Sequence, residues 1–576
     1  MKKRYIFLAI IAVMLLQVCS VYAEKQTITS KDMTLYLFFA EDSHIKPVYF
    51  IGDSDVPYIS LEDWGELYTY MMRNYLAQTI SESNFGLVFS QDGEIGKLTR
   101  TDGDPYPMTV DCVADTISFW DYDAFIRPEA DRVLVDVLEV DGSHSDDDRV
   151  LFKRTNKSYE RYGDPVVLDC GAYGINLVAD EKGVYVPLQT LSDFLLAIKN
   201  INAFYNGEII AITFLSGFNG TPLGELFYNV EPKDRSEAMG AFSFAELCLA
   251  FDNLYGLKVS HGISSFADLV DQVGAREIMM GPDPNQADAA LFTIIWKHLD
   301  DMHSSFVAPS PLSREGLLDE MIEKIGYGQQ YDARVRQLIK YYFARYEKYP
   351  EGVPAYEEIG NTAYITFDKF LSAADEVDFY ETAPTADAAD SVGILLYAYS
   401  QIMREDSPIE NVVLDLSNNG GGQAEAAVFV LSAFLGDGYA SVKNTMSGAL
   451  ATGVYNVDMN LDGKFDEADR GLLTKKRFAL ITPVSFSCGN LVPSVFKNSN
   501  EVTLIGRTSG GGSCVVLPMS TAYGTHFQIS GPNRISFARN GSFYDIDQGA
   551  EPDISLIFPE SFYDREALTE YINNIK

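Results

Sequence analysis

Two short apolar runs constrain the fold of this chain most, because each ends in a cluster of small and polar residues. Residues 412–416 lead into Asn418-Asn-Gly-Gly-Gly422, and residues 478–481 lead through a proline into Ser485-Phe-Ser-Cys-Gly489. Short apolar runs bounded by glycine, proline and serine predict buried strands. Helical patterns alternate with such strands from residue 410 onward, which predicts an α/β core. One strand end could supply a serine nucleophile and the other bare backbone N–H groups, the pair that acyl transfer needs.

The 576 residues are too many for one ordinary domain, so we expect two or three. Residues 24–235 are rich in β-branched and aromatic residues with turn signals, which predicts an N-terminal α+β accessory region of one or two small modules. Residues 240–576 are expected to form the catalytic domain, with a helical segment at 240–348.

The first 23 residues read as a secretory signal peptide, with a basic start, a short apolar core and a small-residue exit that predicts cleavage after Ala23. Cys19 leaves lipoprotein anchoring as an alternative, although Val18 stands where a lipobox prefers glycine or alanine. No other stretch is apolar enough to span a bilayer. We therefore expect an extracytoplasmic protein, periplasmic or secreted, with no membrane span in the mature chain.

Acidic residues outnumber basic ones by 82 to 44, giving a net charge of −38, and such a surface repels nucleic acid and anionic membranes. A hydrophobic content of 47% argues against disorder. Five cysteines remain after cleavage, which is too sparse and odd a set for a disulfide framework. Cys488 and Cys514 are the first pair to test for a single bridge.

Several motifs in order make residues 240–576 resemble the C-terminal processing (tail-specific) serine peptidases and their tricorn-core relatives. The resemblance implies an α/β catalytic domain with a crotonase/ClpP-like superhelix and a nucleophile at Ser487. The segments that carry it are Leu299-Asp-Asp-Met-His-Ser304, Asp415-Leu-Ser-Asn-Asn-Gly-Gly-Gly422, Phe486-Ser-Cys-Gly-Asn490, Thr503-Leu-Ile-Gly-Arg-Thr-Ser-Gly-Gly-Gly512 and Gly549-Ala-Glu-Pro-Asp-Ile554.

The catalytic base is where this chain departs from the processing peptidases. That branch places a lysine about 25 residues after its serine, but residues 498–532 contain no lysine. The resemblance to the tricorn-like branch implies His303 as the base, and a serine hydroxyl needs such a neighbour. His526, in a late strand, is the reserve candidate. A second departure is Asn490, which stands where the family has glutamate.

The resemblance also implies the groups around the serine and the histidine. Asp545 and Asp547 are the candidates for orienting His303, and the sequence does not choose between them. Asp301 and Ser304 remain alternatives for that role. The N–H groups of Gly421 and Cys488 are expected to bind the oxyanion. Pro493 predicts that the helix after the nucleophile begins at about residues 491–493.

An independent motif lies between the two strand ends, at residues 458–469. It fits the calcium-loop pattern, with glycine at position 6 and an aspartate at position 12 in place of the EF-hand glutamate. We therefore expect a structural Ca²⁺ and no cofactor for catalysis; the alternative is an acidic solvated insertion. The predicted ligands are Asp458, Asn460, Asp462, the Lys464 carbonyl, Asp466 and Asp469.

Together these patterns predict a secreted serine endopeptidase with a peptide or protein substrate. Two alternatives on the same fold remain open: a catalytically silent peptide- or ligand-binding protein and a carboxylesterase. A calcium-dependent surface or scaffold protein is a third.

Overall fold

The computed structural model describes residues 27–75, 85–102, 107–127, 134–138, 149–218, 220–374 and 377–575. The predicted signal peptide and Cys19 lie outside these residues. Within them, no helix combines the length and the apolar character needed to cross a membrane.

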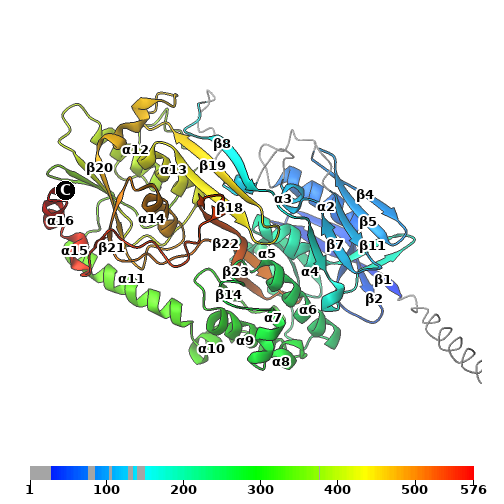
Figure 1. Cartoon of the computed structure of the whole chain (residues 1–576). Helices are drawn as coiled ribbons and strands as arrows, with labels where there is room; N and C mark the ends of the chain where they lie inside the picture. Colours follow the sequence, from blue (N-terminus) through cyan, green and yellow to red (C-terminus); the bar gives the residue numbers. More distant parts are fainter. Residues whose placement is uncertain are drawn as a thin grey trace, which may run out of the picture.

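A six-stranded sheet forms the core that the alternating pattern predicted, in the order β15-β16-β17-β20-β21-β26. Figure 1 labels two of its strands, β20 and β21. All neighbours in it are parallel except β15 and β16. Parallel pairing places the carboxyl ends of β17 and β20, with their small-residue turns, at the same edge. The strands are β15 (Tyr356–Ile359), β16 (Thr362–Thr366), β17 (Asn411–Asp415), β20 (Lys476–Ile481), β21 (Thr503–Gly506) and β26 (Ile554–Ser555).

Helices cover both faces of this sheet, which explains why its strands are almost continuously apolar. Val412 and Leu414 pack with one group of helices, while Val413 between them packs with the other. The first group is α12 (Ser391–Ile402), α13 (Ala424–Leu435) and α14 (Cys488–Ser499). The second is α11 (Gln329–Lys348), α15 (Glu560–Tyr563) and α16 (Arg565–Asn573).

A second sheet, β14-β23-β18-β19-β8 with β22 on β23, draws strands from three separate parts of the chain. β8 belongs to the predicted accessory region and pairs antiparallel with β19 along its whole length, from Phe152↔Val457 to Arg161↔Leu450. The sheet therefore crosses the boundary expected between residues 235 and 240. Its strands are β8 (Phe152–Arg161), β14 (Ser305–Ala308), β18 (Gly438–Asn444), β19 (Leu450–Val457), β22 (Cys514–Ser520) and β23 (His526–Ser536).

The rest of the N-terminal region is α+β and contains two further sheets, ordered β10-β11-β3-β2-β1-β13-β12 and β4-β5-β6-β7-β9. The strands of the first are β1 (Ile28–Leu37), β2 (Ser43–Ile51), β3 (Tyr58–Ser60), β10 (Val178–Asp180), β11 (Gly183–Pro187), β12 (Ile201–Tyr205) and β13 (Ile209–Phe214). Those of the second are β4 (Leu87–Asp92), β5 (Ile95–Arg100), β6 (Met108–Asp111), β7 (Thr116–Phe119) and β9 (Val166–Asp169). The α-helices are α2 (Leu61–Asn74), α3 (Tyr122–Ile126), α4 (Leu188–Leu191) and α5 (Pro222–Tyr228).

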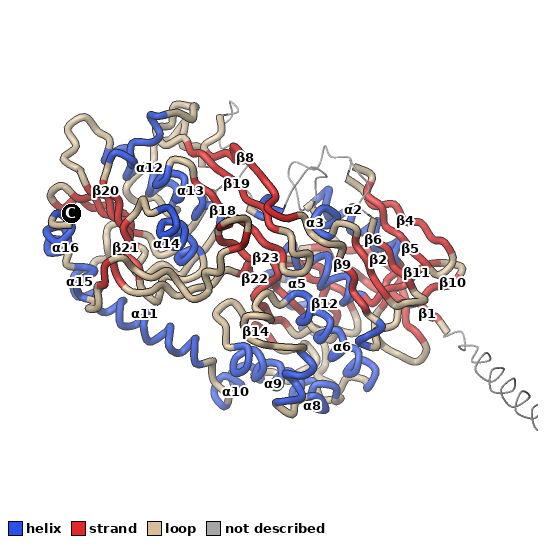
Figure 2. The backbone as a smooth tube through the Cα atoms, viewed as in Figure 1, coloured by secondary structure: helices blue, strands red, loops and turns tan. Residues whose placement is uncertain are grey.

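The segment predicted to be helical contains α6 (Glu237–Leu254), α7 (Phe266–Gln272), α8 (Arg276–Met280), α9 (Pro284–Thr293), the π-helical turn η7 (Ile294–Leu299) and α10 (Leu317–Lys324). It ends in α11, the long helix that runs from α10 towards α15 (Figure 2). The Trp296 ring anchors this helix, since its centroid lies 4.9 Å from that of Tyr327 and 5.3 Å from that of Tyr331.

Candidate active site

Ser487 lies at the N-terminus of α14 in a backbone conformation that few non-glycine residues adopt, with φ 57° and ψ −121°. Its N–H donates to the Gly511 carbonyl at 2.9 Å, and the N–H of Phe486 donates to the Asn419 carbonyl at 3.1 Å. Two glycine-containing turns thus hold the serine segment from opposite sides. Its hydroxyl makes no hydrogen bond to any residue that the structure describes, and the residue is half-buried.

The glycine turn after β17 lies directly against Ser487. At Gly421, where φ is +105°, an added Cβ would stand 2.7 Å from the Ser487 Cβ and 3.3 Å from the Cys488 amide nitrogen. No residue other than glycine fits there, both because of this contact and because of the positive φ.

Of the two predicted oxyanion donors, one N–H group is free and the other is hydrogen-bonded. The Cys488 N–H has no partner among the described residues, as an oxyanion donor requires. The Gly421 N–H, in contrast, donates to Asn419 Oδ1 at 2.9 Å and is not free. The unpaired amide of this turn is that of Gly422.

His303 lies beside the serine segment, as its motif implied. Its ring centroid is 4.7 Å from that of Phe486, the residue before the nucleophile. Its Cε1 is 3.2 Å from the place that a Cβ on Gly512 would take. Within the described part of the chain, the ring makes no hydrogen bond, to Ser487 or to any other residue. Burial lowers the pKa of His303 to about 4; the Asp301 carboxylate acts in the opposite direction and the Arg334 cation in the same one.

Asp301, considered from the sequence as an alternative orienting group, contacts His303 through the main chain and makes no hydrogen bond to the His303 ring among the described residues. Its charge acts to raise the pKa of that ring. Its Oδ1 accepts the N–H groups of His303 and Ser304, and its Oδ2 accepts the hydroxyls of Tyr255 and Ser304. The carboxylate is buried and fixes the main chain at His303.

Asp545 and Asp547, the expected orienting groups, contact Arg534 instead of His303. Asp547 also accepts the N–H of Ser513 at 2.7 Å. The two carboxylates pair with Arg534 because this arginine, on β23, is buried and needs a counter-charge. These aspartates therefore brace the turn that carries Gly511 and Gly512.

Asn490, which departs from the family pattern, holds two loops together. Its Oδ1 accepts the Ser509 hydroxyl at 2.7 Å, and its Nδ2 donates to the Ile546 carbonyl at 2.9 Å. The helix that carries it begins at Cys488, earlier than predicted, and contains Pro493 in its interior. The proline removes the one hydrogen bond that would reach the carbonyl of Gly489, and the buried packing of α14 compensates for it.

His526, the reserve base, belongs to the core. Its ring lies among phenylalanine rings, at 4.3 Å from Phe204 and 4.9 Å from Phe218 between centroids. Burial lowers its pKa to about 3. It faces the N-terminal region and not Ser487.

The five cysteines that the structure describes are free, so it contains no bridge between Cys488 and Cys514. Cys488 Sγ lies 3.3 Å from the Gly422 carbonyl, and burial raises the pKa of its thiol to about 12.

The loop 458–469 turns its side chains onto its own backbone. Asp458 accepts the amides of Asp462 and Gly463, and Asp469 accepts those of Met459 and Asp466. Among the described residues, no group of three or more His, Cys, Asp or Glu side chains is gathered where it could hold a metal ion. Calcium binding by this loop stays a prediction.

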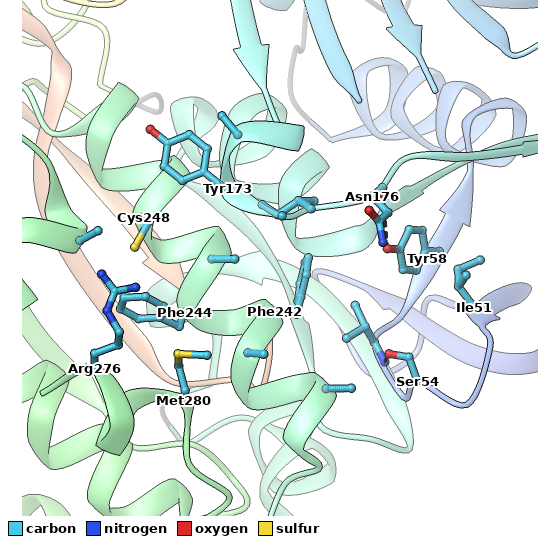
Figure 3. Close-up of a pocket in the computed structure, with 18 residues that line it drawn as sticks. Ile51, Ser54, Tyr58, Tyr173, Asn176, Phe242, Phe244, Cys248, Arg276 and Met280 are labelled. Atoms are coloured by element: carbon cyan, nitrogen blue, oxygen red, sulfur yellow. Dashed lines mark hydrogen bonds between the residues drawn. The ribbon is translucent and has the colours of Figure 1, made fainter. Parts of the chain in front are cut away.

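A cavity of about 580 Å³ lies away from Ser487, between the N-terminal region and α6 (Figure 3). Tyr58 and Asn176 line one side, and Phe242, Phe244 and Cys248 of α6 line another. None of the residues described above around Ser487 lines this cavity, so it is a separate feature of the molecule.

One residue of the site escaped the sequence motifs. Arg334, on α11, has its guanidinium carbon 4.7 Å from the Phe486 ring centroid. No local pattern marks it, because only the packing of α11 against the parallel sheet brings it to the serine.

Comparisons with known proteins found several similar proteins. A protein of Chlamydia pneumoniae is 30% identical over 114 residues, which are 18% of this chain and 17% of that protein. The photosystem II D1 C-terminal processing protease is 16% identical, with a TM-score of 0.26, over 34% of this chain and 43% of that one. A lipoprotein from Streptococcus agalactiae is 12% identical, with a TM-score of 0.34, over 60% of this chain and 98% of that one.

The chain thus spans less than half of the processing protease and less than a fifth of the Chlamydia protein. Residues 361–556 match the model of peptidase family S41. This range includes the glycine turn, Ser487 and the Arg534 cluster, while His303 lies before it. This part of the chain, which carries Ser487, therefore resembles peptidase family S41.

Proposed function

We propose that the protein is a serine endopeptidase that cleaves peptide or protein substrates through an acyl-enzyme at Ser487. The observation that carries the proposal is the strained turn at Ser487, which presents its hydroxyl at the start of α14 beside the unpaired N–H of Cys488. Strained backbone of this kind concentrates at functional sites, and free amides beside a hydroxyl suit an oxyanion.

In the proposed reaction, Ser487 Oγ attacks the peptide carbonyl carbon while His303 accepts its proton. The Cys488 N–H and an amide of the glycine turn, for which that of Gly422 is free, bind the oxyanion. His303 then protonates the leaving amine, and water releases the acyl group by the reverse sequence. A depressed pKa keeps His303 neutral at neutral pH, which is the form that accepts a proton.

The hydroxyl and the imidazole must come together for this step. The Ser487 Oγ is available for this contact, since it has no other partner among the described residues. Catalytic hydrogen bonds often tighten only when substrate binds. The basic, apolar and small-residue pattern of residues 1–23 supports the further proposal that the enzyme acts outside the cytoplasm.

A fluorophosphonate probe tests the nucleophile. We expect covalent labelling of the wild type, none of Ser487→Ala, and wild-type labelling of Ser542→Ala, an exposed serine of the same domain. His303→Ala should lose labelling as well, whereas the exposed His298→Gln should keep it. Labelling that survives in Ser487→Ala contradicts the proposal.

A second candidate is a binding protein on the same fold, favoured by the missing hydrogen bond between Ser487 and His303. It predicts no labelling of the wild type and unchanged peptide binding by Ser487→Ala. Esterase activity is separated by matched peptide and ester substrates, because an esterase cleaves only the latter.

A further inference from the structure

A single cation reaches the nucleophile segment from α11. The Arg334 guanidinium lies over the Phe486 ring, with its carbon 4.7 Å from the centroid. On its other side, Nη2 is 3.3 Å from where a Cβ on Gly420 would stand. Arg334 therefore lies between the residue before Ser487 and the start of the glycine turn.

This arginine has no counter-ion among the residues that the structure describes, although other cations on the same helix do. Arg345 pairs with Asp368, and Lys348 pairs with Asp564. Arg336 is exposed to solvent, whereas Arg334 is partly buried, and burial lowers the pKa of Arg334 to about 10. It stays charged at neutral pH. Desolvating an unpaired cation is costly, and this chain has 82 acidic residues to offer as partners.

We propose that Arg334 binds a carboxylate of the peptide substrate next to the bond that Ser487 cleaves. The guanidinium presents a planar fork of N–H donors that matches a carboxylate in two parallel hydrogen bonds. The contact with the Phe486 ring restricts the position of the guanidinium. The inference rests on the proposed peptidase function and adds a substrate class to it.

The carboxylate can come from two sources with the same chemistry. An Asp or Glu side chain near the cleaved bond fits the endopeptidase proposed above, whereas the C-terminus of the peptide would mean that Ser487 removes only the last residues of its substrate. Either source would replace the missing counter-ion and would hold the scissile carbonyl between the Cys488 N–H and Ser487. Because Arg334 lies against the glycine turn, its contact with the substrate carboxylate would lie close to the reacting atoms.

The test uses one internally quenched peptide sequence in three forms: with a free C-terminal carboxylate, with a C-terminal amide, and with the amide plus a glutamate beside the cleaved bond. We expect kcat/KM for at least one carboxylate form to exceed that for the uncharged amide by about tenfold or more, as a charged hydrogen-bonded pair supplies. A preference for the first form assigns a terminal carboxylate, and a preference for the third assigns an acidic side chain.

Variants on the same helix make the result specific. Arg334→Gln should abolish the carboxylate preference, measured as the ratio of kcat/KM between the carboxylate and amide peptides of the same variant. The exposed Arg336→Gln is the matched control and should keep the preference. Equal kcat/KM for all three peptides, or a preference that survives in Arg334→Gln, overturns the inference. Failure of the wild type to label at Ser487 instead overturns the proposed function itself, so the two failures are distinguishable.

Discussion

The imidazole of His303 lies in surroundings that favour its neutral form. The Phe486 ring and Gly512 cover it, and the Arg334 charge faces it, so both burial and charge oppose protonation. Asp301 moves the pKa the other way while it holds the main chain. The base and the proposed substrate cation therefore share one electrostatic environment.

The acid limb of kcat/KM should report this environment. A base must be neutral, and the His303 pKa is lowered from 6.5 to about 4, so we expect activity to fall only as the pH drops towards about 4. Asp301→Asn removes the charge that raises the pKa and should move the limb to lower pH. Asp547→Asn does not touch His303 and should leave the limb in place. A wild-type limb near pH 6.5 contradicts the assignment.

The same shift has a consequence for stability. A histidine whose pKa is lower in the folded protein contributes stability that is complete above about pH 6.5 and is lost as the pH falls from there through about 4. The loss amounts to about 3.5 kcal/mol at most, at about 1.4 kcal/mol for each pKa unit. His303→Gln should remove its part of this dependence in denaturation measurements, while His526 keeps its own.

Gly421 offers a test of the close approach at the serine. Gly421→Ala places a methyl group 2.7 Å from the Ser487 Cβ at a φ of +105°, so we expect labelling to be lost and unfolding to become easier by about 1–3 kcal/mol. Gly541→Ala is the control, because its φ is +73° but nothing lies within 4 Å of the added carbon. Wild-type labelling of Gly421→Ala contradicts the described geometry.

At the scale of elements, the sequence pattern predicts the strands and turns that depend only on residues close together in the chain. The strands ending at Asp415 and Ile481, and the turns after them, follow from apolar runs that stop at glycine, proline and serine. The sequence pattern does not predict the partners of Asp547 and Arg334, because these partners depend on how β23 and α11 pack. The start of α14 was misplaced for the same reason: packing overrides the local penalty of Pro493.

The loop between β19 and β20 carries its own prediction. If the segment 458–469 binds Ca²⁺, a hundredfold excess over Kd adds about 2.7 kcal/mol to the free energy of unfolding. We expect the melting temperature to fall on chelation, and Asp458→Ala to abolish both this response and the calorimetric heat. Labelling of Ser487 should persist without the ion. No heat and an unchanged melting temperature contradict calcium binding.

At the scale of the whole molecule, the sheet that contains β8, β14 and β19 joins the accessory region, the helical segment and the domain that carries Ser487. Side-chain contacts strengthen the junction: the Asp123 carboxylate accepts from Asn444 and Ser447, and Gln189 donates to the Ser520 carbonyl. The N-terminal region is thus continuous with the domain that carries Ser487.

Removing residues 1–235 should therefore not only delete a module but also impair the folding of the rest of the chain. The truncated chain exposes the edge of β19, and an unpaired edge favours aggregation. We expect the fragment 240–576 to elute as aggregate in size-exclusion chromatography, and co-expression with residues 24–235 to restore a soluble complex. A monomeric fragment with wild-type labelling contradicts this view.

The packing of Trp296 at the start of α11 gives the protein an optical signal of its own. Tyr327 and Tyr331 lie against this indole, and Arg334 follows one helical turn later. Any displacement of α11 by an occupant of Arg334 changes the surroundings of the indole, and with them its fluorescence. Comparison with Trp296→Phe separates this emission from that of Trp64 and Trp120, so occupancy can be followed in solution without a label.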